Sequence, residues 1–127
     1  MSLRFPSVSR ENYLKSILRL KDQKGYVRSV DVAERMQVSK PSVTNAVSVL
    51  RESGDVLLDE QHNIVLTEQG ERAAREIEQR YETGYRLLRR AGVPEELARH
   101  DAGAMEHGLS TDSAAYLKKF LEELPDA

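Results

Sequence analysis

SKPSVTNAVSVLR, residues 39–51, shows the clearest helical pattern in the chain. Ser39 is a favoured residue for a helix N-cap, and Pro41 suits the first turn, where a missing N–H group costs little. Apolar residues follow at the spacing of one helical face, at Val43, Ala46, Val47 and Leu50. The other face carries short, polar or cationic side chains and no carboxylate, at Lys40, Pro41, Thr44, Asn45, Ser48 and Arg51. The stretch predicts a helix with one buried face and one small, polar, exposed face.

The segments on either side of this helix predict a fixed order of elements. Before it we expect a helix that begins near Ser9 and ends by Gly25, then a short helix capped by Ser29, then a tight turn at residues 37–38. After Gly54, apolar runs at 56–58 and 64–66 flank a polar turn and predict a β-hairpin.

Three more helices are expected in the second half of the chain. The first is long, is capped by Thr67 and ends at Gly92; the second opens at residues 93–96 and ends at Gly108. The third is capped by Ser110 and closed by Pro125, and its expected buried stripe is Ala114, Leu117, Phe120, Leu121 and Leu124.

Helix, short helix, turn, polar-faced helix and hairpin follow one another in the order of a winged helix-turn-helix. The fold class predicted is therefore mainly α: a winged helix-turn-helix DNA-binding domain at residues 7–70, followed by an all-helical domain at 71–124. In this fold the polar face enters the major groove, where Asn can pair with adenine and small side chains allow close approach. The candidate DNA-binding residues are Arg28, Ser29, Ser39, Lys40, Pro41, Ser42, Thr44, Asn45, Ser48, Arg51 and His62.

Charge and composition favour the same interpretation. Residues 1–51 carry ten Lys/Arg and four Asp/Glu, a balance of +6, whereas residues 52–127 have a balance of −8. A basic half that holds a helix-turn-helix favours a polyanionic partner. The chain has no cysteine, which excludes disulfides and thiol chemistry, and it shows no enzyme motif. No apolar run is long enough to span a membrane, so we expect a cytoplasmic protein with no membrane partner.

Four short stretches resemble one family. GYVRSVDVA at 25–33, SKPSVT at 39–44, VLTEQG at 65–70 and EHGLS at 106–110 look like the diphtheria-toxin-repressor and manganese-transport-regulator family. The similarity runs from about Ser9 to Leu124, and the length matches the shorter type without a third, SH3-like domain. The resemblance implies a homodimeric repressor that binds palindromic double-stranded operator DNA when manganese or iron is bound, with residues 71–124 as the dimerisation and metal-sensing domain.

The metal positions that the resemblance implies are changed in this chain. The first-helix positions are Asn12 and Lys15, the long-helix histidine position is Tyr81, and a carboxylate or cysteine position is Gly103. Only Glu106 and His107 keep the ligand types. Tyr85 stands at a second-site carboxylate position, and His100 lies one residue from a second-site histidine position.

Two interpretations of these positions stay open. Glu106 and His107 bind a divalent metal in the family's manner, or they form a metal-free polar cluster with Tyr81, Lys15 or Asn12. For the whole protein we expect a homodimeric, sequence-specific transcriptional regulator that is not an enzyme. The alternatives are a winged-helix regulator that is metal-independent or responds to a small ligand, and a winged-helix module that binds protein. The basic excess before residue 52 argues against the last.

Overall fold

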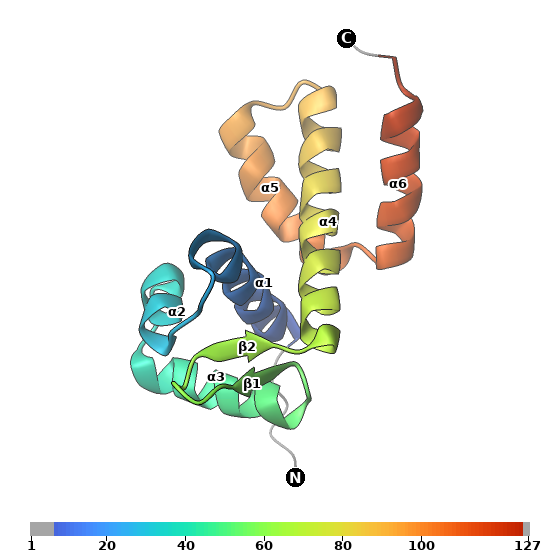
Figure 1. Cartoon of the computed structure of the whole chain (residues 1–127). Helices are drawn as coiled ribbons and strands as arrows, with labels where there is room; N and C mark the ends of the chain where they lie inside the picture. Colours follow the sequence, from blue (N-terminus) through green and yellow to red (C-terminus); the bar gives the residue numbers. More distant parts are fainter. Residues whose placement is uncertain (1–6, 126–127) are drawn as a thin grey trace. The chain divides into compact units, whose positions relative to one another are not determined.

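The computed structural model describes residues 7–125, which divide into two units, the first ending at Arg75 and the second beginning at Glu76. The first unit contains α1 (Ser7–Lys24), α2 (Ser29–Met36), α3 (Lys40–Glu52), β1 (Val56–Leu58), β2 (Ile64–Leu66) and the start of α4 (Glu68–Arg90). The second unit contains the rest of α4, with α5 (Glu95–Gly108) and α6 (Thr111–Glu123) on either side of it (Figure 1). This mainly helical architecture with one small hairpin is the predicted one.

The core of the first unit forms between α1, α2 and α3. Leu14, Ile17 and Leu18 of α1 are fully buried, as are Val43 and Leu50 of α3. The turn between α2 and α3 needs a left-handed residue, and Gln37 supplies it with φ of 54°. The predicted apolar face of α3 is therefore the face that packs, and its polar face is exposed.

Helix boundaries follow the predicted caps in α3, α4 and α6. Ser39 accepts a hydrogen bond from the Ser42 N–H group at 3.2 Å, and Ser110 accepts one from the Ser113 N–H group at 3.0 Å. Thr67 Oγ1 accepts a bond from the Gly70 N–H group at 3.1 Å. These bonds satisfy N–H groups that the first helical turn leaves without partners.

Two predicted helix starts differ from the structure. Helix α1 begins at Ser7 rather than near Ser9, so Ser9 lies inside the helix. The N-cap of α2 is Arg28 rather than Ser29, because the Asp31 carboxylate already accepts the Arg28 N–H group at 3.4 Å. At the start of α2 the hydrogen bond between Arg28 and Asp31 therefore forms in place of a cap by Ser29.

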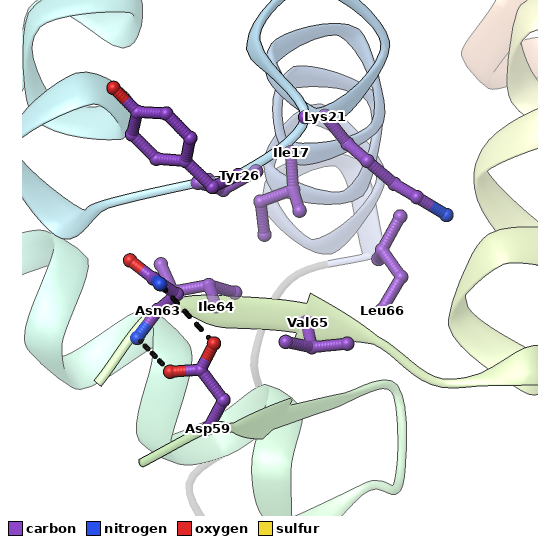
Figure 2. Close-up of a pocket in the computed structure, with 10 residues that line it drawn as sticks. Ile17, Lys21, Tyr26, Asp59, Asn63, Ile64, Val65 and Leu66 are labelled. Carbon is purple, nitrogen blue, oxygen red and sulfur yellow. Dashed lines mark hydrogen bonds between the residues drawn. The ribbon is translucent and has the colours of Figure 1, made fainter. Parts of the chain in front are cut away.

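The hairpin forms as predicted, with Val56 opposite Leu66 and Leu58 opposite Ile64 in an antiparallel pair. It is attached to the segment before α2, because the Ile64 N–H group donates to the Val27 carbonyl at 2.8 Å. A cavity of about 100 Å³ lies between α1 and β2, with Ile17 and Leu66 in its lining and Lys21 beside them (Figure 2). The hydrogen bond between Ile64 and Val27 holds the hairpin against the helix-turn-helix of the same unit.

In the second unit, α4 packs on both α5 and α6. Gly84 of α4 lies against Met105 of α5, and Tyr85 lines a groove with Leu121 of α6 and with Leu124, the residue directly after that helix. Phe120, expected in the buried stripe of α6, is 53% exposed. The prediction for Phe120 is wrong for the single chain because Ala114 and Leu121 carry the packed face, and Phe120 lies beside exposed Tyr116 instead. No helix within residues 7–125 has the length and apolar character needed to cross a membrane.

Candidate nucleic-acid interface and metal centre

The exposed face of α3 is the first part of the candidate nucleic-acid interface. All seven predicted contact residues between Lys40 and Arg51 are exposed: Lys40, Pro41, Ser42, Thr44, Asn45, Ser48 and Arg51. The Thr44 hydroxyl donates to the Lys40 carbonyl at 3.1 Å, and the Ser39 and Ser42 hydroxyls lie 2.9 Å apart. These three hydroxyls are therefore already engaged within the helix. The amide of Asn45 makes no hydrogen bond to another described residue, which leaves its donor and acceptor available to a base edge.

The hairpin turn is the second part. The Asp59 carboxylate accepts the N–H groups of Gln61 and Asn63, both at 2.9 Å. The Asn63 side chain adds a bond at 3.2 Å, and both bonds between Asp59 and Asn63 are drawn in Figure 2. These bonds hold the pKa of Asp59 below its ordinary value, and the bond from the Asn63 backbone N–H group contributes most. The turn also places His62 at φ of 65°, an unusual conformation for a residue other than glycine. The tip is thus a rigid, internally bonded loop.

An open groove of about 610 Å³ lies between this hairpin tip and the start of α2. We call it the wing groove; its lining residues are Tyr26, Arg28, Ser29, Gln61, His62 and Asn63. The Arg28 guanidinium lies over the Tyr26 ring, 5.2 Å from its centroid, which holds the cation at the groove. No acidic residue is among the lining residues. A cation, a helix N-terminus and hydroxyl and amide donors suit a phosphate group.

The wing groove brings together three of the predicted DNA-binding residues, Arg28, Ser29 and His62. Tyr26 and Gln61 were missed by the sequence reasoning. The Tyr26-Val27-Arg28 order gave a usable signal for Tyr26, because an aromatic residue two positions from an arginine in an extended segment can lie beneath its guanidinium. Gln61 gave none, since its place depends on the turn geometry that Asp59 sets.

The two candidate metal ligands lie near the end of α5. Glu106 is 2% exposed, and His107 Nε2 lies 3.6 Å from Glu106 Oε1. On α4 the Tyr81 ring stacks on Tyr85, with centroids 6.3 Å apart and planes at 10°. Gly103 contributes no side-chain donor, and a Cβ there would meet nothing within 4 Å. His100 points to solvent, with a side chain 83% exposed and bonded to Asp101 at 3.2 Å. The second unit therefore supplies Glu106 and His107 as an adjacent pair of donors.

The first-helix positions have the opposite electrostatic character. Asn12 and Lys15 line a groove of about 270 Å³ within the first unit, and the other charged side chains in its lining are Arg19 and Arg35. Three cationic side chains disfavour a divalent cation at this surface. Among residues 7–125, no three His, Cys, Asp or Glu side chains group closely enough to hold a metal ion.

A helix-turn-helix with an exposed polar helix and a hairpin wing defines the class of winged-helix DNA-binding proteins. Comparison with family models then gives the family. The model described as "Iron dependent repressor, N-terminal DNA binding domain" matches residues 7–64, and "Iron dependent repressor, metal binding and dimerisation domain" matches residues 67–126. The chain belongs to the iron-dependent repressor family, as a homodimeric DNA-binding transcriptional regulator.

Two curated relatives align with most of this chain. The chain is 36% identical over 124 residues to the HTH-type transcriptional regulator MntR of Lysinibacillus sphaericus, covering 95% of this chain and 89% of the relative. It is 34% identical over 105 residues to MntR of Bacillus subtilis, covering 83% of this chain and 74% of the relative. The resemblance to the manganese-regulator type is confirmed.

Solved structures share the fold. An IdeR of T. acidophilum superposes with a TM-score of 0.79 at 28% identity, over 93% of this chain and 56% of that one. A manganese-dependent transcriptional repressor in complex with manganese gives 0.77 at 26% identity, over 89% of this chain and 52% of that one. The chain thus spans about half the length of these two solved proteins.

The family name implies a divalent metal, so the donors of this chain must be tested against one. Manganese and iron need several converging carboxylate, carbonyl and imidazole ligands. Within the second unit the donors at these positions are Glu106 and His107, and within the first unit Lys15 lies among other cations. Neither set of residues, taken by itself, fits a manganese or iron site of the family type.

Proposed function

We propose that the protein represses transcription by binding palindromic operator DNA through α3 and the wing groove of each protomer. Helix α3 lies in the major groove, where Pro41 and Asn45 face the base edges. Lys40 and Arg51 pair with phosphates at the two ends of the helix, and Ser39, Ser42, Thr44 and Ser48 pack against the backbone and base edges. The observation that carries the proposal is the exposed face of α3, which has no carboxylate between residues 39 and 51.

The wing groove supplies a second phosphate contact on the same unit. Arg28, Ser29 and His62 surround it, and the N–H groups at the start of α2 add a favourable partial positive charge. Backbone contacts fix the register of a protein on the duplex, and base contacts provide the sequence preference. The wing groove therefore positions α3, and α3 specifies the site.

This arrangement assigns a separate function to each of the two parts of the chain. We place the DNA-binding domain at residues 7–70 and the dimerisation domain at 71–124. A twofold homodimer presents two copies of α3, and its operator should have half-sites about one helical turn apart, or a multiple of that spacing. Cytoplasmic location is part of the same proposal, since the operator is there.

Selection of duplexes from a random pool, followed by a salt titration, tests the proposal. We expect a palindromic consensus and an affinity that falls steeply with salt, by a logarithmic slope of about −0.9 for each phosphate neutralised. A protein-binding winged-helix module would yield no consensus and no steep slope. Either missing result would contradict operator binding.

A further inference from the structure

Arg80, in the middle of α4, joins the three helices of the second unit. Its Nε donates to the Glu106 carbonyl of α5 at 2.8 Å, and its Nη1 donates to Thr111 Oγ1 at the start of α6, at 3.1 Å. Both bonds come from one rigid, planar guanidinium, which fixes two acceptors at once. Arg80 therefore holds the end of α5 and the start of α6 against α4.

The C-terminal end of α5, which Arg80 contacts, is a favourable environment for a cation. The Glu106 carbonyl belongs to the last turn of α5, which ends at Gly108, so it has no N–H partner further along its own helix. Carbonyls at a helix C-terminus also carry the negative end of the helix dipole. A guanidinium here satisfies a carbonyl and opposes that dipole, and it remains charged at any physiological pH.

The same end of α5 carries Glu106 and His107, the only two of the six family-type positions that keep ligand residues. Their carboxylate and imidazole lie 3.6 Å apart, and Gly103, one turn earlier, adds no third donor. Tyr81, next to Arg80 on α4, stacks on Tyr85. The second unit thus has an incomplete set of metal ligands. Next to it lies the permanent cation Arg80, which already makes hydrogen bonds to α5 and α6.

We propose that Arg80 orders the α4–α5–α6 unit constitutively, so that operator binding by this regulator does not depend on a divalent metal. A metal that switches a repressor must bind the DNA-ready arrangement better than the alternative, and without a donor set it has no differential affinity to contribute. In this chain the ordering cation is covalently part of α4. The inference rests on the proposed operator binding for its effect on DNA, whereas its claims about metal and about Arg80 concern the protein alone.

Three measurements on the full chain, freed of metal with a chelator, test the metal claim. Calorimetric titration with MnCl₂, with ZnCl₂ and with anaerobic FeSO₄ should show no heat from saturable metal binding. Thermal melting should be unchanged when each metal is added. Operator affinity should change by less than about 5-fold, the lower end of ordinary allosteric coupling. A specific titration, a metal-dependent rise in melting temperature, or a larger gain in affinity would each overturn the proposal.

Variants of Arg80 test the claim that this residue orders the α4–α5–α6 unit. Arg80→Gln should lower the melting temperature and weaken operator binding, and added metal should restore neither. Arg80→Lys keeps the charge but not the two-donor fork, and should recover part of the loss. The matched control is Arg86→Gln, which replaces an exposed arginine of the same helix that makes no hydrogen bond or ion pair with another described residue and should leave both readouts unchanged. If Arg80→Gln behaved like the control, or if metal rescued it, the proposal would fail.

A restored donor set provides the converse test and shows that the assays can detect a site. Asn12→Asp, Lys15→Glu, Tyr81→His and Gly103→Glu together recreate the family's ligand types, and the open space at residue 103 accommodates a side chain. This variant should gain a metal titration that the native chain lacks; equal titration of both proteins would contradict the inference. If the native chain bound no operator at all, the proposed function would fail, while calorimetry and melting would still decide the metal claim.

Discussion

Arg10 of α1 and Asp55, the residue before β1, form a bidentate ion pair although they lie 45 residues apart in the sequence. The guanidinium Nε and Nη2 each lie 2.9 Å from a separate oxygen of the fully buried Asp55 carboxylate. Ser53 donates to the same carboxylate at 2.8 Å and Gln69 of α4 at 2.9 Å. Asp55 therefore connects α1, the end of α3 and the start of α4 within the first unit.

Replacing this carboxylate should destabilise the DNA-binding unit. Burial alone would raise the pKa of Asp55, but the hydrogen bonds from Arg10, Gln69 and Ser53, with the charge of Arg10, outweigh it and lower the pKa. We expect Asp55→Asn to cost about 1–3 kcal/mol of unfolding free energy at pH 7, because the buried acceptor loses the charge that strengthens its hydrogen bonds, while the Arg10 side chain is 36% exposed and stays partly hydrated. Urea unfolding followed by circular dichroism measures the loss.

The pH dependence has a definite sign. Since the folded pKa of Asp55 is below its unfolded value of about 3.9, its contribution is complete above that value and is lost as pH falls through the folded pKa. The difference between native chain and Asp55→Asn should shrink in acid. Glu71→Gln, which removes the solvent-accessible ion pairs of Glu71 with Lys21 and with Arg75, both at 3.1 Å, is the control and should have a much smaller effect. Equal effects of the two substitutions would contradict the role given to Asp55.

Gly70 gives a second prediction at the same junction. A Cβ at this position would overlap the carbonyl oxygen of Asp55, so α4 can approach β1 only with glycine here. We expect Gly70→Ala to cost about 3 kcal/mol or more, since backbone must shift to accept the methyl group. Gly103→Ala is the matched control, because its Cβ meets nothing within 4 Å. It should gain about 0.5–1 kcal/mol from helix propensity. Both values come from urea or thermal unfolding, and a stable Gly70→Ala protein would contradict the close approach.

The caps and the long-range contacts explain what the sequence could predict. Ser39 and Ser110 were predictable because a cap bonds a residue three positions away, so the whole signal lies in one short window. The polar face of α3 followed from its period for the same reason. Arg10 and Asp55 had no such signal, because their partnership exists only after α1 and α3 have packed.

The second unit shows the same limit. Arg80 was one of many charged residues in a charged helix, and its acceptors lie 26 and 31 positions away. Phe120 fits an apolar stripe by spacing, but spacing does not distinguish a face that packs within the chain from one left for another chain. For the metal positions, the residue types alone already indicated an incomplete donor set.

Asn45 should determine the base preference of α3. Asn45→Ala removes the amide that has no bond to another described residue and should reduce discrimination by about 1–3 kcal/mol at one base pair. Lys40→Ala should instead weaken all sequences alike and reduce the salt slope by about one. Competition binding with operator variants separates the two effects. An unchanged preferred sequence in Asn45→Ala would mean that α3 lies in the groove with another register.

The exposed apolar residues of α6 should form part of the homodimer interface. Tyr116 and Phe120 stand one turn apart on the same side of the helix and are 79% and 53% exposed. A monomer would leave this patch in water, so we expect Phe120→Asp to shift the protein towards monomer at micromolar concentration. Glu122→Ala, on a different side of α6, is the control. Sedimentation or light scattering reports the mass, and an unaltered dimer in Phe120→Asp would place the interface elsewhere.

His62 should affect stability and DNA affinity in opposite directions. Its φ of 65° costs a residue with a Cβ about 1 kcal/mol that glycine would not lose. His62→Gly should therefore raise the melting temperature while it weakens operator binding, because the wing groove loses one phosphate contact. The loss should be similar for all DNA sequences. Gln37→Gly, at φ of 54° in the turn between α2 and α3, is the matched control. It should gain stability by the same mechanism and keep its affinity, since Gln37 does not line the wing groove. Melting curves and fluorescence anisotropy with labelled operator give both readouts. If His62→Gly became more stable and bound DNA as well as the native chain, the phosphate contact assigned to the wing tip would be wrong.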